Sequence, residues 1–248
     1  MKDIELWHGD CLELMKDIPD GSVDMILCDL PYGVTKNKWD SVIPFDPLWK
    51  EYLRVSKEKS AIVLFGQGMF TCKLMLSNEG DWRYNLIWDK VLSSGFLNAN
   101  RMPLRSHEDI CVFYRRLPNY NPQYTQGKPC HSKGTLKGSD INNNYGSHTL
   151  VENKSTTNKH PLSIKRTRKP HPSKSLHPTE KPVDLLSWLI KSYTNEGETI
   201  LDNCMGSGST GIACLDTNRR FIGIEKDDKY FQIAKKRMED HQKQLRMF

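Results

Sequence analysis

The stretch Val23-Asp24-Met25-Ile26-Leu27-Cys28-Asp29-Leu30-Pro31-Tyr32 decides the fold of this chain. Its first six residues form a largely apolar run with the length of a buried strand, and Pro31 stops that strand. Open α/β folds bind their ligands at the carboxyl ends of such strands. The stretch therefore predicts that an acid, a conformationally restricted carbonyl and an aromatic ring meet at a ligand-binding sheet edge.

Strand-like and helix-like segments alternate on both sides of this stretch. Further strands are predicted over residues 4–7, 61–65, 84–88, 110–114, 199–202 and 220–224. Helices are predicted over residues 12–18, 47–55, after Gly68, over 182–193 and 209–216, and from Asp228 onward. Strands that alternate with helices indicate an α/β fold, here a mainly parallel sheet covered by helices on both faces.

Composition excludes several classes of protein. The 248 residues suffice for one large domain with an insertion, and no apolar stretch approaches the roughly 18 residues that span a bilayer. The seven cysteines form no Cys-x-x-Cys pair, so neither a disulfide framework nor a metal site is indicated. These features argue against secretion and membrane insertion, and they favour a reducing cytoplasm.

Positive charge is concentrated in one part of the chain. Residues 115–181 hold 13 Lys and Arg against 3 Asp and Glu, so this segment carries +10 within a chain of net charge +6. The remaining residues carry −4. A basic segment on a mildly acidic body favours binding to a polyanion such as nucleic acid; the alternative is a solvated loop.

The same region lacks a regular apolar pattern from residue 117 to residue 172. Loops of this length are functional or disordered in compact domains. We therefore predict a body formed by residues 1–114 and 176–248, with a basic insert over 115–175 that is partly disordered without DNA. The candidate phosphate-contacting residues in the insert are Lys165, Arg166, Arg168, Lys169 and His171.

A glycine-rich turn, Gly206-Ser207-Gly208-Ser209-Thr210-Gly211, follows the predicted strand 199–202 and opens a helix. Glu225 ends the next strand, where an acid can accept hydrogen bonds from ribose hydroxyls. NAD and S-adenosylmethionine both satisfy this pattern, and a turn made only for packing remains the alternative. After the helix that the turn opens, only one strand and one closing helix follow, which leaves no room for the second half of a dinucleotide fold.

Three segments resemble the motifs of amino DNA methyltransferases. Asp29-Leu30-Pro31-Tyr32 resembles the (Asp/Asn/Ser)-Pro-Pro-(Tyr/Phe) signature, with Leu30 in place of a proline. The segment from Asp202 to Gly208 resembles the Asp-x-Phe-x-Gly-x-Gly motif that holds S-adenosylmethionine, and 177–182 resembles His-Pro-x-x-Lys-Pro. The alternative interpretation of the last segment is the start of a helix that is bounded by a proline. The order of the three is similar to the β group of the family.

The resemblance implies a Rossmann-like methyltransferase fold with a seven-stranded sheet, permuted so that the catalytic half precedes the cofactor half. It implies a methyl transfer from S-adenosylmethionine, which becomes S-adenosylhomocysteine. The implied catalytic residues are Asp29, Leu30, Pro31 and Tyr32. The implied cofactor-binding residues are Lys181, Asp202, Asn203, Cys204, Gly206, Ser207, Gly208 and Glu225. Asp10 joins them by its place after the first strand, where a plain turn is the alternative.

The chemistry of an aromatic amine explains the signature. Adenine N6 donates its lone pair to the ring, and hydrogen bonds from its protons to the Asp29 carboxylate and the Leu30 carbonyl would return electron density to nitrogen. Pro31 restricts Leu30 to extended conformations. Tyr32 would stack on a base swung out of the duplex, because the amine is otherwise paired.

We therefore expect a site-specific DNA methyltransferase acting on N6 of adenine, because Asp29 at the first signature position favours adenine within the family. The alternatives are a cytosine-N4 enzyme on the same scaffold, an RNA or protein-glutamine methyltransferase, and a catalytically inactive nucleic-acid-binding module. The resemblance implies double-stranded DNA as partner, and family members often form homodimers and work with a companion restriction endonuclease. It implies a bacterial or phage origin.

Overall fold

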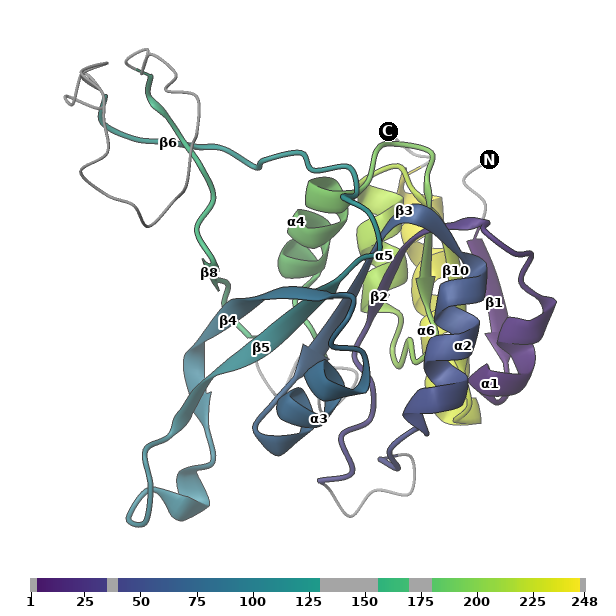
Figure 1. Ribbon diagram of the computed structural model, residues 1–248, viewed down its shortest axis with the longest axis horizontal. Helices are drawn as coiled ribbons and strands as arrows, with labels where there is room; N and C mark the ends of the chain where they lie inside the picture. The colour runs from purple at the N-terminus through teal and green to yellow at the C-terminus, as the bar shows by residue number, and fades with distance from the viewer. Residues whose placement is uncertain (1–3, 35–39, 130–155, 170–179, 246–248) are drawn as a thin grey trace. The chain divides into compact units, whose positions relative to one another are not determined.

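The computed structural model describes residues 4–34, 40–129, 156–169 and 180–245 (Figure 1). By their internal contacts they divide into two units. The first combines the chain up to Asn121 with the chain from Ser163 onward, and the second spans Pro122–Leu162. His171 and residues 177–179 of the His-Pro-x-x-Lys-Pro segment lie outside the described residues.

An eight-stranded sheet forms the centre of the first unit, in the order β1-β10-β9-β2-β3-β5-β4-β8. The strands are β1 (Ile4–His8), β2 (Val23–Cys28), β3 (Ser56–Gly66), β4 (Trp82–Ser94), β5 (Arg105–Phe113), β8 (Ile164–Arg166), β9 (Thr199–Asp202) and β10 (Arg220–Glu225). Only β5 runs against its neighbours among these strands; the other pairs are parallel. The predicted mainly parallel α/β sheet is confirmed.

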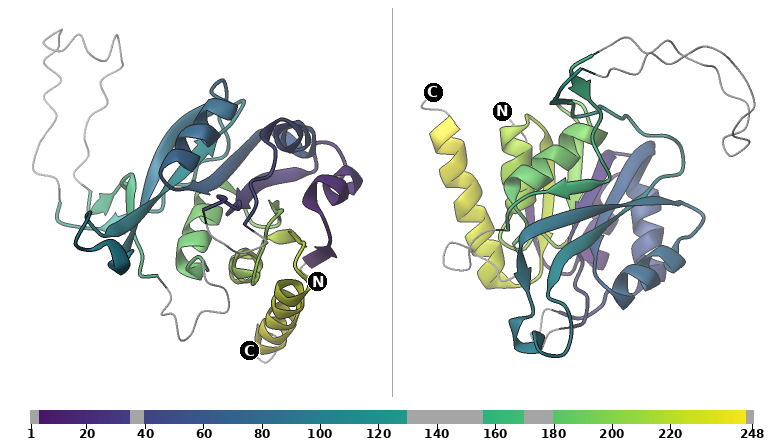
Figure 2. Two further views of the ribbon diagram at one scale, coloured as in Figure 1. Left: turned by 90° about the horizontal axis from the view of Figure 1, so that it is seen from below. Right: turned by 90° about the vertical axis from the view of Figure 1, so that its left-hand side faces the viewer.

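Helices cover both faces of this sheet, as the two views of Figure 2 show. One face packs against α1 (Cys11–Leu14), the 3-10 turn η1 (Met15–Asp17), α2 (Phe45–Val55) and α3 (Met69–Ser77). The other packs against α4 (Val183–Tyr193), α5 (Ser209–Asp216) and α6 (Asp228–Leu245). Of the described helices, none has both the length and the apolar character needed to cross a membrane.

Strand β2 shows how the sequence builds the two cores. Met25 and Leu27 lie in the apolar cluster with α4–α6, whereas Ile26 and Cys28 lie in the cluster with α1–α3. All four are almost fully buried. Because alternate side chains of a strand point to opposite faces, a strand covered on both faces has to be apolar throughout. The run that decides the fold is therefore the centre of the sheet.

Two details differ from the sequence-based expectations. The sheet has eight strands where seven were expected, because β8 from the basic segment pairs parallel with β4 at the sheet edge. The predicted helix over 12–18 is a short α1 followed by the turn η1. Asp10 caps α1, since its Oδ1 accepts a hydrogen bond from the Leu12 N–H at 2.9 Å.

The second unit contains a small two-stranded sheet. Strand β6 (Thr125–Gln126) pairs antiparallel with β7 (Asn158–Lys159). The Gly127 N–H donates to the Thr157 carbonyl at 2.8 Å. The expected insert, 115–175, is thus wider than this unit: residues 115–121 and 163–169 belong to the first unit.

Candidate active site

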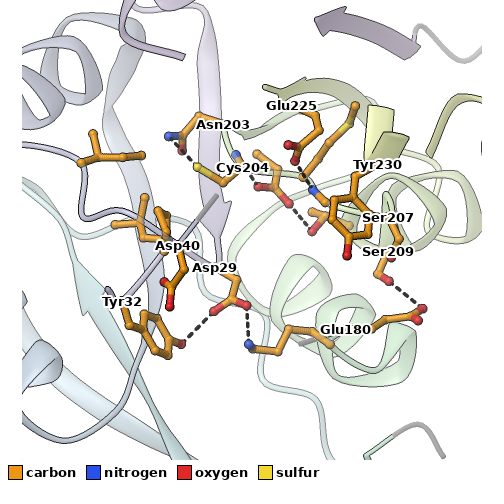
Figure 3. A pocket seen from close by; sticks show the side chains of 18 of the residues that line it. Asp29, Tyr32, Asp40, Glu180, Asn203, Cys204, Ser207, Ser209, Glu225 and Tyr230 are labelled. Carbon is orange, nitrogen blue, oxygen red and sulfur yellow. Dashed lines mark hydrogen bonds and ion pairs between the residues drawn. The ribbon is translucent and has the colours of Figure 1, made fainter. Parts of the chain in front are cut away.

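A pocket of about 720 Å³ opens at the carboxyl edge of the sheet. Part of its lining comes from four segments at the ends of parallel strands: 9–12 after β1, 29–32 after β2, 202–207 at the end of β9, and 225–227 at the end of β10. Figure 3 shows side chains of three of these segments around the pocket, among them Asp29, Asn203 and Glu225. The predicted catalytic signature and the predicted cofactor turn thus face one cavity.

Asp29 stands directly after β2 and holds two side chains with its carboxylate (Figure 3). The Tyr32 hydroxyl donates to Oδ1 at 2.8 Å, and the Lys181 ammonium donates to Oδ2 at 2.5 Å. Burial raises the pKa of Asp29, and the adjacent positive charge of Lys181 opposes that rise. Lys181 therefore favours the ionised, hydrogen-bond-accepting form of a half-buried carboxylate.

Lys181 belongs to a row of alternating charges that we call the charge chain: Asp29, Lys181, Glu108 and Lys90. The Lys181 Nζ lies 3.3 Å from Glu108 Oε2, and the Lys90 Nζ lies 3.2 Å from Glu108 Oε1. Burial acts to lower the pKa of Lys181, but Asp29 and Glu108 outweigh it and raise that pKa. In the same way, burial acts to raise the pKa of Glu108, but the two lysines lower it. Each charge thus stabilises the ionised state of the next.

The backbone of the signature is anchored at several points. The Leu30 side chain is buried in the cluster beneath α1–α3, and the Tyr32 ring stacks on Phe70 with centroids 4.7 Å apart. The Asp40 carboxylate accepts the N–H groups of Gly33 at 2.8 Å and Val34 at 3.0 Å. At the position where the family's signature has a proline, the buried Leu30 side chain thus holds the backbone in place.

Glu225 organises the glycine turn at the other end of the pocket (Figure 3). Its Oε2 accepts the Gly206 N–H at 2.9 Å and its Oε1 accepts the Asp227 N–H at 2.8 Å. Gly206 has φ +53°, a backbone conformation that favours glycine. Burial raises the pKa of Glu225. Since each carboxylate oxygen has a second lone pair, Glu225 can also accept hydrogen bonds from a ligand.

Asp202 and Asn203 are tied into the protein more than into the pocket. Asp202 accepts the Thr210 hydroxyl at 2.6 Å and the Cys204 N–H at 3.2 Å, and burial raises its pKa to about 6. The Asn203 Oδ1 accepts the Tyr52 hydroxyl at 2.6 Å. Both residues line the pocket, but their hydrogen bonds hold the turn between β9 and α5 in shape.

Gly208 is not among the residues that line the pocket. It has φ +79°, and a Cβ there would lie 2.8 Å from the Met238 Cε and 3.0 Å from the Ala234 Cβ. Its glycine is required by the turn and by the close approach of α6. Ser207 does line the pocket, and its carbonyl accepts a hydrogen bond from Arg237 Nη1 at 3.2 Å.

The predicted phosphate contacts fall on and after β8. Arg166 and Arg168 are exposed, and Arg166 lies 3.6 Å from Asp89 of β4. The Lys165 ammonium lies over the Trp188 ring at 5.1 Å. Lys169 lines the pocket. These four residues therefore extend from the edge of the sheet to the pocket.

Sequence reasoning missed several pocket residues. Glu108 carried no predicted role, because β5 runs antiparallel and brings the beginning of a strand to the carboxyl edge. Lys90, on β4, had no predicted role either. Asp40 had no motif around it. Glu180 was predicted only as part of a motif; its Oε1 binds Ser209 at 3.1 Å and Arg237 at 2.9 Å. Within the described residues, no three His, Cys, Asp or Glu side chains form a metal-binding group.

The fold and the pocket define an α/β enzyme for a ligand held at the carboxyl edge of the sheet, and the comparisons give its family. The DNA methylase family model N6_N4_Mtase matches residues 23–236. The chain belongs to this family of amino DNA methyltransferases, as its motifs predicted.

Curated relatives match over nearly the whole chain. Type II methyltransferase M2.MboI of Moraxella bovis is 27% identical over 263 residues, which cover 95% of this chain and 88% of that protein. DNA adenine methyltransferase YhdJ of Escherichia coli K12 is 26% identical over 94% of this chain and 81% of its own length.

Solved structures share the fold. The M1.HpyAVI–SAM complex aligns with a TM-score of 0.63 and 25% identity, covering 94% of this chain and 99% of that one. The cytosine-N4-specific PvuII DNA methyltransferase aligns with a TM-score of 0.68 at 13% identity, covering 96% and 91%. The predicted Rossmann-like methyltransferase fold is confirmed by these neighbours.

Proposed function

We propose that this protein transfers the methyl group of S-adenosylmethionine to N6 of adenine in double-stranded DNA. The observation that carries the proposal is the shared pocket, in which residues 29–32 and 202–207 line one cavity of about 720 Å³. A methyl donor bound at one end would face an amine held at the other. The named relatives support DNA as the substrate, and YhdJ supports adenine.

The donor set of the pocket fits the cofactor. Acids at the ends of several strands line it, among them Asp10, Asp29, Asp202 and Glu225, and acids suit a ligand that carries a sulfonium, an ammonium and ribose hydroxyls. Glu225 and the Gly206 turn would hold the nucleoside part of the ligand. When bound, S-adenosylmethionine supplies an electrophilic methyl group.

The signature would bind and orient the amine. The Asp29 carboxylate and the Leu30 carbonyl would accept the two N6 hydrogens, which returns electron density to nitrogen. A held amine in line with the methyl group needs no covalent enzyme intermediate, so positioning and electrostatics supply the catalysis. Tyr32 would pack on the extruded base, while its hydroxyl keeps Asp29 in place.

Lys181 is proposed as a positioning residue for Asp29, in addition to the cofactor contact that the His-Pro-x-x-Lys-Pro resemblance implies. It donates to Asp29 and is 7% exposed. It would act through Asp29 by fixing the rotamer and the charge of that carboxylate. Glu108 and Lys90 would neutralise the remaining charge around it.

The product of the reaction tests the proposal. Plasmid DNA is incubated with the protein and S-adenosylmethionine, digested to nucleosides and analysed by mass spectrometry, with Asp29→Asn as the matched variant. We expect N6-methyladenine with the wild type and none above background with Asp29→Asn. If the product is N4-methylcytosine, the target base is cytosine and not adenine. If no methylated nucleoside is found, the proposed function is wrong. Sequencing the modified sites gives the target sequence.

Two partners implied by the resemblance stay predictions. Sedimentation of the purified chain tests the homodimer. A companion restriction endonuclease would cut unmodified DNA at the same target sequence, so protection of methylated plasmid from that cleavage tests the pairing. A DNA substrate would also place the working enzyme in the cytoplasm.

A further inference from the structure

The turn between β4 and β5 is an exposed apolar surface that the proposed chemistry does not use. We call residues 95–104 the hairpin tip. Phe96 is 77% exposed, Leu97 is 83% exposed and Met102 is 55% exposed. Three large apolar side chains on one short turn are unusual for a surface without a partner.

The hairpin tip is held in a defined shape by its own backbone. It begins at Gly95, with φ +89°, and continues as the 3-10 turn η2 (Phe96–Asn98). The Asn98 N–H donates to the Gly95 carbonyl at 2.9 Å, and the Asn98 carbonyl accepts the N–H of Arg101 at 2.8 Å and of Met102 at 3.0 Å. Because the turn is already ordered, little conformational entropy is lost when it binds.

Topology places the hairpin tip beside the pocket. Strand β4 lies in the same direction as β2, so its end lies at the carboxyl edge, where the pocket opens. Ser94 and Arg105, the two residues at the base of the tip, both line the pocket. Figure 1 shows the β4–β5 hairpin projecting from the sheet with a short helical turn at its end.

The charge around the hairpin tip favours a nucleic-acid partner. Residues 91–107 contain no Asp or Glu and include the exposed Arg101 and Arg105. Strand β8, which pairs with β4, ends at the exposed Arg166, and the exposed Arg168 follows two residues later. Apolar side chains flanked by arginines match a duplex, in which stacked bases lie between phosphates. A second copy of this chain would bring like charges together.

We propose that the hairpin tip is a wedge that enters the DNA next to the target base, with Phe96 and Leu97 occupying the space from which the base is extruded. The inference rests on the proposed function. Extrusion loses stacking and pairing worth a few kcal/mol, and apolar side chains inserted between base steps offset part of that loss. The wedge would thus act on base extrusion and leave cofactor binding alone.

The test uses a duplex that carries 2-aminopurine at the methylated position, once sequencing has identified that position. Its fluorescence rises when the base leaves the stack. Phe96→Ser and Leu97→Ser are compared with Leu117→Ser, which is 71% exposed and follows the end of β5 at the opposite sheet edge. All three sites are exposed, so the variants should fold like the wild type, which circular dichroism checks.

We expect the double variant Phe96→Ser/Leu97→Ser to lose most of the fluorescence rise and to methylate DNA at least about five-fold more slowly, since base stacking on a side chain is worth about 1–3 kcal/mol, which corresponds to roughly 5- to 150-fold. Its affinity for S-adenosylmethionine and the behaviour of Leu117→Ser should match the wild type. Unchanged fluorescence and rate in the double variant would overturn the wedge while DNA methylation by the wild type stands.

Two other results would overturn the inference in distinguishable ways. If the wild type methylates no DNA, the proposed function fails and takes the wedge with it. If the wild type sediments as a dimer and the double variant as a monomer, with the fluorescence rise preserved, the hairpin tip is an interface between two copies of the chain.

Discussion

Replacing Lys181 by methionine removes the positive charge of the buried ammonium and keeps a similar apolar length. The ammonium lies 2.5 Å from Asp29 and 3.3 Å from Glu108, and the side chain is 7% exposed. In the variant, the Asp29 carboxylate would keep its hydrogen bond from the Tyr32 hydroxyl but lose the ammonium. Glu108 would keep its ion pair with Lys90. The change therefore leaves two partly buried carboxylates with less compensation than they have now.

The magnitudes follow from these contacts. Removing one partner of a buried ion pair costs about 3–5 kcal/mol of stability, and the remaining partners favour the lower value here. A hydrogen bond to a charged group is worth about 1.5–3 kcal/mol, which corresponds to roughly a 10- to 150-fold fall in the rate of transfer if orientation of Asp29 is lost.

The pH dependence gives the sharper signature. Burial raises the pKa of Asp29 and Lys181 opposes it, so the variant should have a still higher pKa at this carboxyl. Transfer needs the ionised form, and activity is lost as pH falls through that pKa. The acid limb of the kcat/KM profile should therefore move to higher pH in Lys181→Met, and raising the pH should restore part of the rate.

The assay is methyl transfer to a plasmid from pH 5.5 to 9, together with calorimetry of S-adenosylmethionine. Lys16→Met serves as control, because Lys16 pairs with Glu13 on an exposed surface. The reasoning is refuted if Lys181→Met keeps the wild-type rate and acid limb but loses cofactor affinity. That result would make Lys181 a cofactor residue, as the motif alone implies.

Three further changes test other parts of the structure. Gly208→Ala should lower the free energy of unfolding by about 1–3 kcal/mol, because of its positive φ and the 2.8 Å approach to Met238; Gly80→Ala, with open space, should change it little in the same denaturant titration. Since burial raises the pKa of Asp202 from 3.8 to about 6, the folded state loses stability as pH rises from the lower value through the higher one, and the loss is complete above about 6. The stability of Asp202→Asn relative to the wild type should thus rise by about 2 kcal/mol from pH 4.5 to 8, and equal curves would contradict this. Arg168→Ala should reduce the slope of log Kd for DNA against log salt by about 0.9, and an unchanged slope would remove Arg168 from the DNA interface.

Much of the fold could be predicted because its signals are local. The β2 and β9 bounds agree with the predicted ranges, since each is an apolar run ended by a polar turn. Helix α5 also agrees, because the glycine turn fixes where it begins. Strand β8 was missed because its three residues carry no apolar pattern and pair only through the edge of β4.

Site residues could be predicted from the sequence where a motif coincides with the end of a strand. They were harder to predict where a contact between distant parts of the chain determines their role. Asp29 and Glu225 line the pocket, as the place of Asp29 directly after β2 and of Glu225 at the end of β10 predicts. The contact of Lys181 with Asp29 joins distant parts of the chain, which no spacing reveals. Gly208 had a local signal for glycine, but α6 and not the pocket lies against it.

The central claim is that Asp29 serves methyl transfer and Glu225 serves cofactor binding at two ends of one pocket. Measuring the two functions separately tests it most directly. Single-turnover methyl transfer at saturating S-adenosylmethionine, combined with the cofactor Kd, is measured for Asp29→Asn and Glu225→Gln. We predict that Asp29→Asn loses transfer and keeps its Kd, whereas Glu225→Gln has a raised Kd and a rate near that of the wild type. The reverse pattern, with cofactor affinity lost at residue 29 and transfer lost at residue 225, would contradict the account.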